Sequence, residues 1–346
     1  MSLTVGMVGG GYFGRFHINA WRRIENVDLI GVADLLDERR TELAALYPGL
    51  TLQPDVDALL AAGTPDVLDV AVPPAYQADL IHPLLGKIPT VICQKPFCRS
   101  LAEAEELTEA AEQAGTKLVV HENFRFMPWY RAIRGEIDSG RTGAVRQACF
   151  RLRPGDGAGA DAYLSRQPYF RDMERFLVHE TGIHWIDVFR YLFGEPDTVY
   201  ADLWRANPVI RGEDAGMLIL TWRNGLRVTL DANRTLDHAA ENHRLTMGEF
   251  TLEGDDATIT LDGYGHLARR SRGATDATKV AYAFEDRDFG GDCVFHFQQH
   301  VISHLLNDTP LETGANDYLQ NIRIEEAAYR SAERQQKIHL HARHTN

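Results

Sequence analysis

The chain has 346 residues, which is long for a single hydrophobic core and favours two domains. Apolar residues make up 44% and charged residues 25%, as is typical of globular enzymes. The formal net charge of −13 argues against a nucleic-acid partner, since phosphate binding requires clustered Lys and Arg, and the lack of any apolar run of about 18 residues argues against a membrane span.

The N-terminal segment and the cysteines predict a cytoplasmic location. The first residues, MSLTVGMVGGGYFG, have no basic region and enter a strand at once, which is not the pattern of a signal peptide. The four cysteines, at positions 93, 98, 149 and 293, form no C-x-x-C pair and no zinc-ligand spacing. We therefore expect reduced thiols and no metal site built on cysteine.

The first predicted element is a short buried strand over residues 3–8, followed by a glycine-rich turn. Gly9, Gly11 and Gly14 satisfy the pattern G-x-G-x-x-G. In that pattern the first glycine permits a tight turn, the second lets the backbone approach a pyrophosphate, and the third lets a helix pack close to the strand. The helix predicted over residues 15–24 would present free N–H groups to the same pyrophosphate.

A second strand, over residues 27–34, ends in Asp34, which lies 20 residues after Gly14. A carboxylate at this place can accept hydrogen bonds from the ribose hydroxyls of NAD and would repel the 2′-phosphate of NADP. The order of strand, glycines, helix, strand and acid therefore predicts a dinucleotide site with NAD as the cofactor. Arg39 and Arg40 follow closely enough to leave NADP as the less favoured alternative.

Further strands alternate with helices in the first third of the chain. Strands are predicted over 66–74, 89–96 and 117–126, and helices over 77–87 and 101–115. This order predicts an α/β Rossmann domain with a doubly wound parallel sheet over residues 1–122, whose ligands bind beyond the carboxyl ends of the strands. The predicted cofactor-binding residues are Gly9, Gly11, Tyr12, Phe13, Gly14, Asp34, Val72, Pro73, Gln94, Lys95 and Asn123.

The stretch VICQKPFCRS, residues 91–100, places Lys95 where a buried strand gives way to a proline. One interpretation is a solvated lysine in a turn between strand and helix. The other is an ammonium group delivered to the edge of the sheet at which the cofactor binds. The local sequence does not decide between them.

From about residue 145 the pattern changes to longer strands, predicted over 145–153, 198–206, 215–222, 226–233, 244–254 and 257–262. The pair Asn224-Gly225 is typical of a hairpin turn. These features predict a C-terminal α+β domain over residues 123–346, with a large, mainly antiparallel open sheet. Helices are predicted over 177–194, 293–307 and 318–333, and the C-terminal ones can pack back on the first domain.

The helix predicted over 177–194 carries His179, Glu180 and His184. In an unbroken α-helix the two histidines would point about 140° apart and could not bind one metal ion, so no metal site is predicted. Glu180 and His184 are four residues apart and would share a face. A carboxylate beside an imidazole fixes its tautomer and suits a general base. The alternative is an acid at the start of a helix and an unrelated surface histidine.

The motifs GGGYFG with the following His17, QKPF, ENFRFMP and ETGIHWIDVFRYLFGEP resemble the Gfo/Idh/MocA family of oxidoreductases, and the resemblance covers nearly the whole chain. It implies a Rossmann domain followed by a domain whose open sheet often forms oligomers, here a homodimer or homotetramer. It also implies that Lys95 polarises the reacting oxygen, that His184 takes the hydroxyl proton, and that Glu180 orients the pair.

Two residues depart from the family pattern. The glutamate of the family's E-K-P motif is Gln94 here, and the usual histidine after the strand-end proline is Gln77. Neither departure removes Lys95 or His184.

The motifs and the resemblance together predict an NAD-dependent oxidoreductase that acts on a CH–OH group of a cyclic sugar or polyol. The substrate would be an aldose that gives a lactone, for example a pentose such as apiose, or an inositol that gives a ketone. The alternatives are an NAD-dependent glycosidase and a non-catalytic regulator that senses nucleotides or sugars. The predicted substrate-binding residues are Lys95, Arg153, Tyr163, Tyr169, His184, Asn233 and Arg234.

Overall fold

The structure, a computed structural model, describes residues 2–340. The chain divides into two compact units. Unit 1 comprises Met1–Asn123 and Val294–Gln320, and unit 2 comprises Phe124–Cys293 and Asn321–Asn346. The predicted division gives the whole of 123–346 to the second domain, with C-terminal helices able to pack back on the first, whereas the structure counts 294–320 with unit 1.

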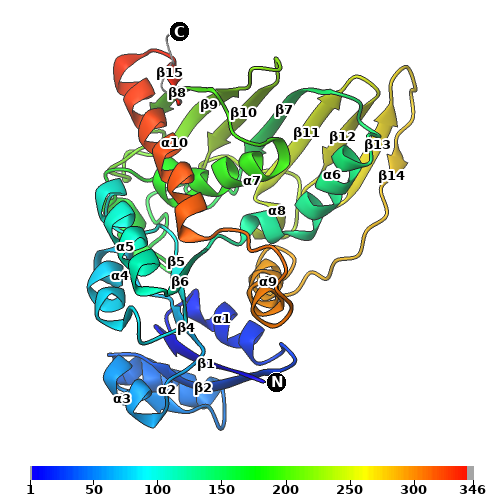
Figure 1. Ribbon diagram of the computed structural model, residues 1–346. Helices are drawn as coiled ribbons and strands as arrows, with labels where there is room; N and C mark the ends of the chain where they lie inside the picture. Colours follow the sequence, from blue (N-terminus) through cyan, green and yellow to red (C-terminus); the bar gives the residue numbers. More distant parts are fainter. Residues whose placement is uncertain (1, 341–346) are drawn as a thin grey trace. The chain divides into compact units, whose positions relative to one another are not determined.

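Unit 1 is built on a six-stranded sheet in the order β3-β2-β1-β4-β5-β6, and every pairing in it is parallel. The strands are β1 (Leu3–Val8), β2 (Val27–Ala33), β3 (Leu52–Gln53), β4 (Val67–Val70), β5 (Thr90–Gln94) and β6 (Lys117–His121). The helices are α1 (Gly14–Trp21), α2 (Asp37–Leu46), α3 (Val56–Ala62), α4 (Pro74–Ile81) and α5 (Leu101–Ala114), while α9 (Cys293–Asn307) and the start of α10 (Ala315–Arg334) also belong to this unit. Figure 1 shows most of the unit in blue and cyan.

The central strands of unit 1 are buried on both faces because helices cover both. Val5, Val67 and Ile92 are each fully buried, as the continuous apolar runs of these strands require. Helix α5 has the predicted ends: the Ser100 side chain accepts a hydrogen bond from the Glu103 amide, and Gly115 closes the helix in the left-handed conformation with φ 70°. The predicted doubly wound parallel sheet is confirmed.

The strand order fixes where a ligand can bind. The chain runs from β1 outward through β2 to β3 and then crosses to β4 on the other side of β1. The direction of the strand order therefore reverses at β1, which opens a crevice at the carboxyl ends of β1 and β4. Gly9, Asp34 and Lys95 each follow the last residue of a strand, β1, β2 and β5 respectively. The topology therefore brings them to one edge of the sheet.

Unit 2 is built on a nine-stranded sheet in the order β14-β13-β12-β11-β7-β10-β9-β8-β15. Its pairings are antiparallel except that of β7 with β10, which confirms the prediction of a mainly antiparallel sheet. The strands are β7 (Val145–Leu152), β8 (Thr198–Trp204), β9 (Ala215–Thr221), β10 (Arg227–Asn233), β11 (Gly248–Gly254), β12 (Ala257–Leu261), β13 (Leu267–Ser271), β14 (Thr278–Lys279) and β15 (Ile338–His339). The helices are α6 (Pro128–Asp138), α7 (Ile183–Phe193), α8 (His243–Thr246) and the rest of α10.

One face of the large sheet is covered and the other is open. Helices α6 and α7 lie along the covered face (Figure 1), where Phe150 of β7 stacks on Trp185 of α7 with ring centroids 4.3 Å apart. On the open face Trp204, Met217 and Ile219 expose 41%, 43% and 37% of their surface. This alternation of buried and exposed residues has the period of two that a sheet with one covered face requires.

Two predicted elements have different local structure. The strand predicted over 244–254 begins only at Gly248, because residues 243–246 form the short helix α8, capped by the Asn242 side chain. The helix predicted over 177–194 is a π-helical turn over Leu177–Gly182 that continues as α7. Among residues 2–340, no helix combines the length and the apolar character that crossing a membrane requires.

Candidate functional site

The glycine loop of unit 1 has open space beside Gly11, whereas Gly9 and Gly14 have no room for a side chain. Gly9 has φ +97°, and a Cβ on it would lie 2.4 Å from the Ala71 carbonyl oxygen. A Cβ on Gly14 would lie 2.4 Å from the Gly9 carbonyl oxygen, whereas a Cβ on Gly11 would meet no atom within 4 Å. Gly9 and Gly14 are therefore required by the turn itself, and Gly11 borders space that a pyrophosphate can enter.

Asp34 is held against this loop by two main-chain donors. Its Oδ2 accepts a hydrogen bond from the Gly10 amide at 2.8 Å, and its Oδ1 accepts one from the Leu36 amide at 3.0 Å. Each carboxylate oxygen keeps a further lone pair that can accept a ribose hydroxyl. The fixed carboxylate and the open space at Gly11 fit a dinucleotide.

The two arginines after Asp34 are engaged with acidic side chains. Arg40 donates to the Asp34 carbonyl oxygen at 2.6 Å and to Asp37 Oδ1 at 2.9 Å, and Arg39 Nη1 lies 3.2 Å from Glu42 Oε2. An arginine in such a pair has less positive charge to offer a 2′-phosphate. This arrangement agrees with the preference for NAD that Asp34 predicts.

Of the other predicted cofactor residues, Tyr12 and Phe13 belong to the same loop and Val72 lies beside it, whereas Asn123 follows the edge strand β6. Val72 Cγ1 would be 3.4 Å from a Cβ on Gly9, and the next residue, Pro73, precedes helix α4. Tyr12 is 37% exposed, whereas Asn123 is only 1% exposed at the end of unit 1. The predicted residue Phe13 packs edge-on against His17, with ring centroids 5.6 Å apart.

Lys95 sits in a turn that begins at the end of β5, with a cis bond to Pro96. The Lys95 amide donates to Gln94 Oε1 at 2.8 Å, and Gln94 Nε2 lies 3.0 Å from His17 Nε2. His17 Nδ1 lies 2.7 Å from Asp69 Oδ2, and both His17 and Asp69 are fully buried. Sequence reasoning missed Asp69, whose only signal was an acid within the apolar strand β4.

In unit 2 the residues Glu180 and His184 come from the π-helical turn and the first turn of α7. A π-turn takes more residues per turn than an α-helix, and the change from one to the other falls between Glu180 and His184. Such turns occur frequently at functional sites. The prediction of a continuous α-helix over 177–194 is thus wrong over Leu177–Gly182, which includes Glu180, one of the predicted catalytic residues.

Glu180 and His184 both have well-defined surroundings. Glu180 Oε2 accepts a hydrogen bond from Thr181 Oγ1 at 2.6 Å and lies 3.8 Å from Arg234 Nη1. The His184 ring is 4% exposed and stacks on Phe124 with centroids 3.7 Å apart and an interplanar angle of 1°. The aromatic contact fixes the plane of the imidazole, and the hydroxyl and guanidinium groups fix the carboxylate.

His179 has a different partner. Its Nδ1 lies 2.7 Å from Oε1 of Glu325, a residue that is 2% exposed. Across the described range 2–340, no group of three or more His, Cys, Asp or Glu side chains is arranged to hold a metal ion.

Arg234, predicted to bind substrate, is an internal residue of unit 2. It is 2% exposed, its Nη2 lies 2.8 Å from Asp156 Oδ2, and its Nε donates to the Tyr163 hydroxyl at 2.7 Å. Burial alone would lower the pKa of Arg234, but the charges of Asp156, Tyr163 and Glu180 outweigh it and raise the pKa. Arg234 therefore remains charged and ties the segment at 156–163 to Glu180.

The remaining substrate candidates differ in exposure. Arg153 is 7% exposed and pairs with Asp231 at 2.7 Å, and Tyr163 is 5% exposed. Asn233 caps its own turn by accepting from the Thr235 amide at 2.9 Å. Tyr169 exposes 58% of its surface. Its pKa is nevertheless raised, first by desolvation of the part that is buried and then by the charge of the Glu180 carboxylate. Tyr169 is thus the exposed candidate that lies in the electrostatic field of Glu180.

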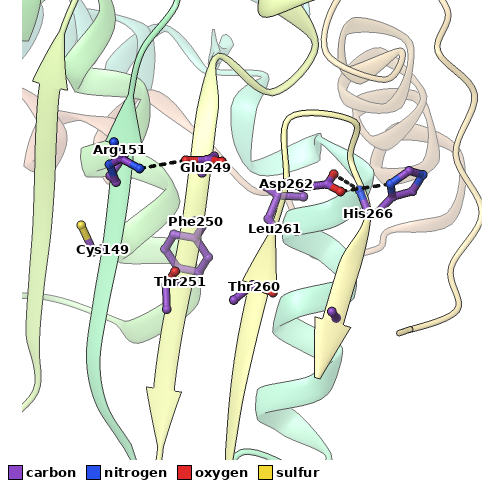
Figure 2. A pocket seen from close by; sticks show the side chains of 10 residues that line it. Cys149, Arg151, Glu249, Phe250, Thr251, Thr260, Leu261, Asp262 and His266 are labelled. Atoms are coloured by element: carbon purple, nitrogen blue, oxygen red, sulfur yellow. Dashed lines mark hydrogen bonds and ion pairs between the residues drawn. The ribbon is translucent and has the colours of Figure 1, made fainter. Parts of the chain in front are cut away.

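A pocket on the open face of the large sheet lies away from these groups. It has a volume of about 350 Å³, and Figure 2 shows it crossed by the ion pairs Arg151–Glu249 at 3.0 Å and His266–Asp262 at 3.1 Å. Its lining residues are Cys149, Arg151, Glu249, Phe250, Thr251, Thr260, Leu261, Asp262, His266 and Ala268. None of them is a predicted site residue.

Comparison with known families accounts for both units. Residues 3–122 match the model of the GFO_IDH_MocA oxidoreductase family with an NAD-binding Rossmann fold, and residues 130–260 match a GFO/IDH/MocA C-terminal domain. The chain belongs to the Gfo/Idh/MocA family of oxidoreductases. The resemblance inferred from the motifs is therefore confirmed.

Individual members of the Gfo/Idh/MocA family are similar over the whole length. A D-apiose dehydrogenase of Paraburkholderia graminis is 31% identical over 339 residues, which cover 96% of this chain and 88% of that protein. A D-apiose dehydrogenase of Rhizobium rhizogenes is 30% identical, with 94% of each chain covered. The crystal structure of an oxidoreductase from Agrobacterium radiobacter in complex with NAD⁺, L-tartaric acid and magnesium superposes with a TM-score of 0.87 at 26% identity, covering 98% of this chain and 99% of that one.

Proposed function

We propose that this oxidoreductase is an NAD-dependent dehydrogenase that oxidises one hydroxyl group of a cyclic sugar or polyol, with D-apiose as the first substrate to test. The use of NAD is supported by the Asp34 carboxylate, which is fixed beside the open space at Gly11 of the glycine loop. Full-length similarity to two D-apiose dehydrogenases supports the substrate class. Oxidation of the cyclic form of an aldose at its anomeric carbon gives a lactone.

The proposed reaction assigns one task to each site residue. NAD, when bound, accepts a hydride from the carbon that carries the hydroxyl group. His184 takes the proton of that hydroxyl, and Lys95 donates a hydrogen bond to the same oxygen as negative charge develops on it. Glu180, held by Thr181 and Arg234, orients these groups. One hydride and one proton thus leave the alcohol, and a carbonyl group remains.

A panel of substrates with NAD tests this proposal. Aldoses, including D-apiose and other pentoses, and inositols are offered singly, and NADH formation is followed by absorbance. Aryl glycosides are included because release of the aryl alcohol would indicate a glycosidase instead. Absence of NAD reduction with every sugar and polyol, combined with tight binding of NAD, would favour the nucleotide-sensing alternative.

We expect the enzyme to prefer NAD over NADP by at least about tenfold in kcat/KM, because a like-charge clash between Asp34 and a 2′-phosphate costs roughly 1.4 kcal/mol or more. Asp34→Ser should reduce this preference. Glu38→Ser is the matched control, since it removes an exposed acid of the same helix, α2, without removing the Asp37 partner of Arg40. Initial rates with both cofactors measure the ratio, and equal use of NAD and NADP by the wild type would contradict the role of Asp34.

We also propose that a second copy of the chain covers the open face of the large sheet, in a homodimer or homotetramer. Trp204, Met217 and Ile219 form an exposed apolar group on β8 and β9, and such groups commonly mark protein contacts. Sedimentation equilibrium should show an oligomer that Ile219→Lys dissociates. A wild-type monomer at micromolar concentration would refute this.

In this proposal the protein acts in cytoplasmic carbohydrate metabolism with its thiols reduced. All four cysteines are free. Burial raises the pKa of the Cys93 thiol well above its usual value and, with the nearby Glu103 charge, that of Cys98 to about 12. These thiols stay protonated at neutral pH, which suits a packing role and not a nucleophile.

A further inference from the structure

Gln77 in helix α4 is fully buried, and its side-chain amide bonds to main-chain groups around Lys95. The two N–H groups of its Nε2 face three carbonyl oxygens, those of Gln94 at 2.7 Å, Pro96 at 3.1 Å and Val72 at 3.2 Å, so one N–H is shared between two acceptors. Its Oε1 accepts from the Cys98 amide at 2.7 Å. A single side chain thus reaches the turn on both sides of Lys95.

The orientation of this amide is fixed by its partners. The Cys98 N–H can only donate, so the oxygen of Gln77 must face it, and the three carbonyl oxygens can only accept, so the NH₂ group must face them. The bond to Val72 also anchors the turn to the segment that follows β4. The conformation of the turn that carries Lys95 is therefore fixed in part by its link to the segment after β4.

Gln94 provides a second neutral contact from the other side. Its Oε1 accepts from the Lys95 amide, and its Nε2 therefore faces His17 Nε2 as a donor. His17 must then carry its proton on Nδ1, where it donates to Asp69. Both glutamines thus hold the turn through uncharged amide groups.

We propose that Gln77 is a positioning residue for Lys95: its amide clamps the turn 94–98 so that the Lys95 ammonium group stays where the reacting oxygen binds. This inference rests on the proposed function for the role of Lys95, but the clamp itself is a property of unit 1. Gln77 does not touch the substrate, and it acts through the main chain at Gln94, Pro96 and Cys98.

The test compares Gln77→Leu with Gln77→His and with a control, Thr116→Val. Leucine has a similar volume and forms none of the four bonds, while histidine keeps one donor and one acceptor. Thr116 is 5% exposed, accepts a hydrogen bond from the Gly86 amide at 2.8 Å and donates one to the Ile88 carbonyl at 3.1 Å. These residues lie just before the first residues of β5 and β6, at the end of the strands opposite to Lys95. The control removes buried hydrogen bonds in the same unit without touching the turn.

Two measurements distinguish the effect of Gln77 on the turn from its effect on the reaction. The first is hydrogen exchange of the Lys95 amide by NMR, since this amide bonds to Gln94 and not to Gln77. We expect exchange roughly tenfold faster in Gln77→Leu and unchanged in Thr116→Val. The second is turnover: kcat should fall by about 10²-fold in Gln77→Leu, with the Kd for NAD changed by less than about threefold, because misplacing a catalytic group slows the reaction without removing the cofactor site.

The outcomes are distinguishable. Gln77→His should give values between those of the wild type and Gln77→Leu. A Gln77→Leu protein with wild-type exchange at Lys95, or with wild-type kcat despite a lowered Tm, overturns the inference. If Gln77→Leu does not fold, both readouts are taken on Gln77→Met, whose unbranched side chain has no N–H donor, and wild-type values of both overturn it. If the wild type oxidises no sugar or polyol, the proposed function fails, and the exchange measurement still decides whether the clamp exists.

Discussion

His184→Ala is expected to lower turnover by roughly 10²- to 10⁴-fold and to remove the rise of kcat/KM with pH, because a general base accepts a proton only in its neutral form. The structure gives the residue the rigidity that this task needs, with a ring 4% exposed and stacked on Phe124 at 3.7 Å. His238→Ala is the matched control, since His238 is 8% exposed in the same unit and bonds to a main-chain carbonyl.

The pH profile must be measured as kcat/KM, with single-turnover experiments to establish that hydride transfer limits the rate. Glu180→Gln should lower the plateau and move the rising limb to lower pH, because a nearby carboxylate favours the imidazolium. The Glu180 carboxylate also faces Arg234 at 3.8 Å, so this displacement should be smaller than for an isolated pair. A His184→Ala enzyme with the wild-type limb and rate would refute the assignment and make Lys95 the stronger candidate for the base.

Lys95→Ala is expected to lower turnover by at least about 10²-fold while NAD binding is largely retained, as for loss of one donor to a developing oxyanion. The turn that carries Lys95 is fixed from both sides by Gln77 and Gln94. A side chain placed on such a support can hold its donor in position before the substrate binds. Turnover and the Kd for NAD are measured on the same preparations.

Two variants accompany this measurement. Lys87→Ala removes an exposed lysine shortly before the opposite end of β5 and should leave turnover unchanged. Gln94→Glu, which restores the family's usual residue, should remain active: one carboxylate oxygen can still accept from the Lys95 amide, and the other can share a proton with His17 Nε2. Wild-type turnover in Lys95→Ala would show that Lys95 is a solvated lysine in a turn, without a role in the reaction.

The sequence by itself determined the framework of unit 1 and the class of its ligand. Apolar runs, the glycines of the turn and the acid at Asp34 are local signals, each readable within about ten residues of an element's end. The structure confirms the parallel sheet and places Gly9 and Asp34 at its carboxyl edge. In unit 2 the succession of longer strands and the turn at Asn224-Gly225 likewise predicted the mainly antiparallel sheet, because hairpin turns join antiparallel neighbours.

Only the tertiary structure decided which side chains meet. Asp69 pairs with His17 across 52 residues, and Gln77 reaches the turn of Lys95 17 residues away. Arg234, which the sequence predicted to bind substrate, meets Asp156 across 78 residues and is 2% exposed. The π-turn at Glu180 was equally hidden, since its register depends on contacts such as that between the Glu213 side chain and the Phe176 amide. A local pattern records the period of a segment, whereas these partners are chosen by the packing of distant segments, which no single stretch of sequence contains.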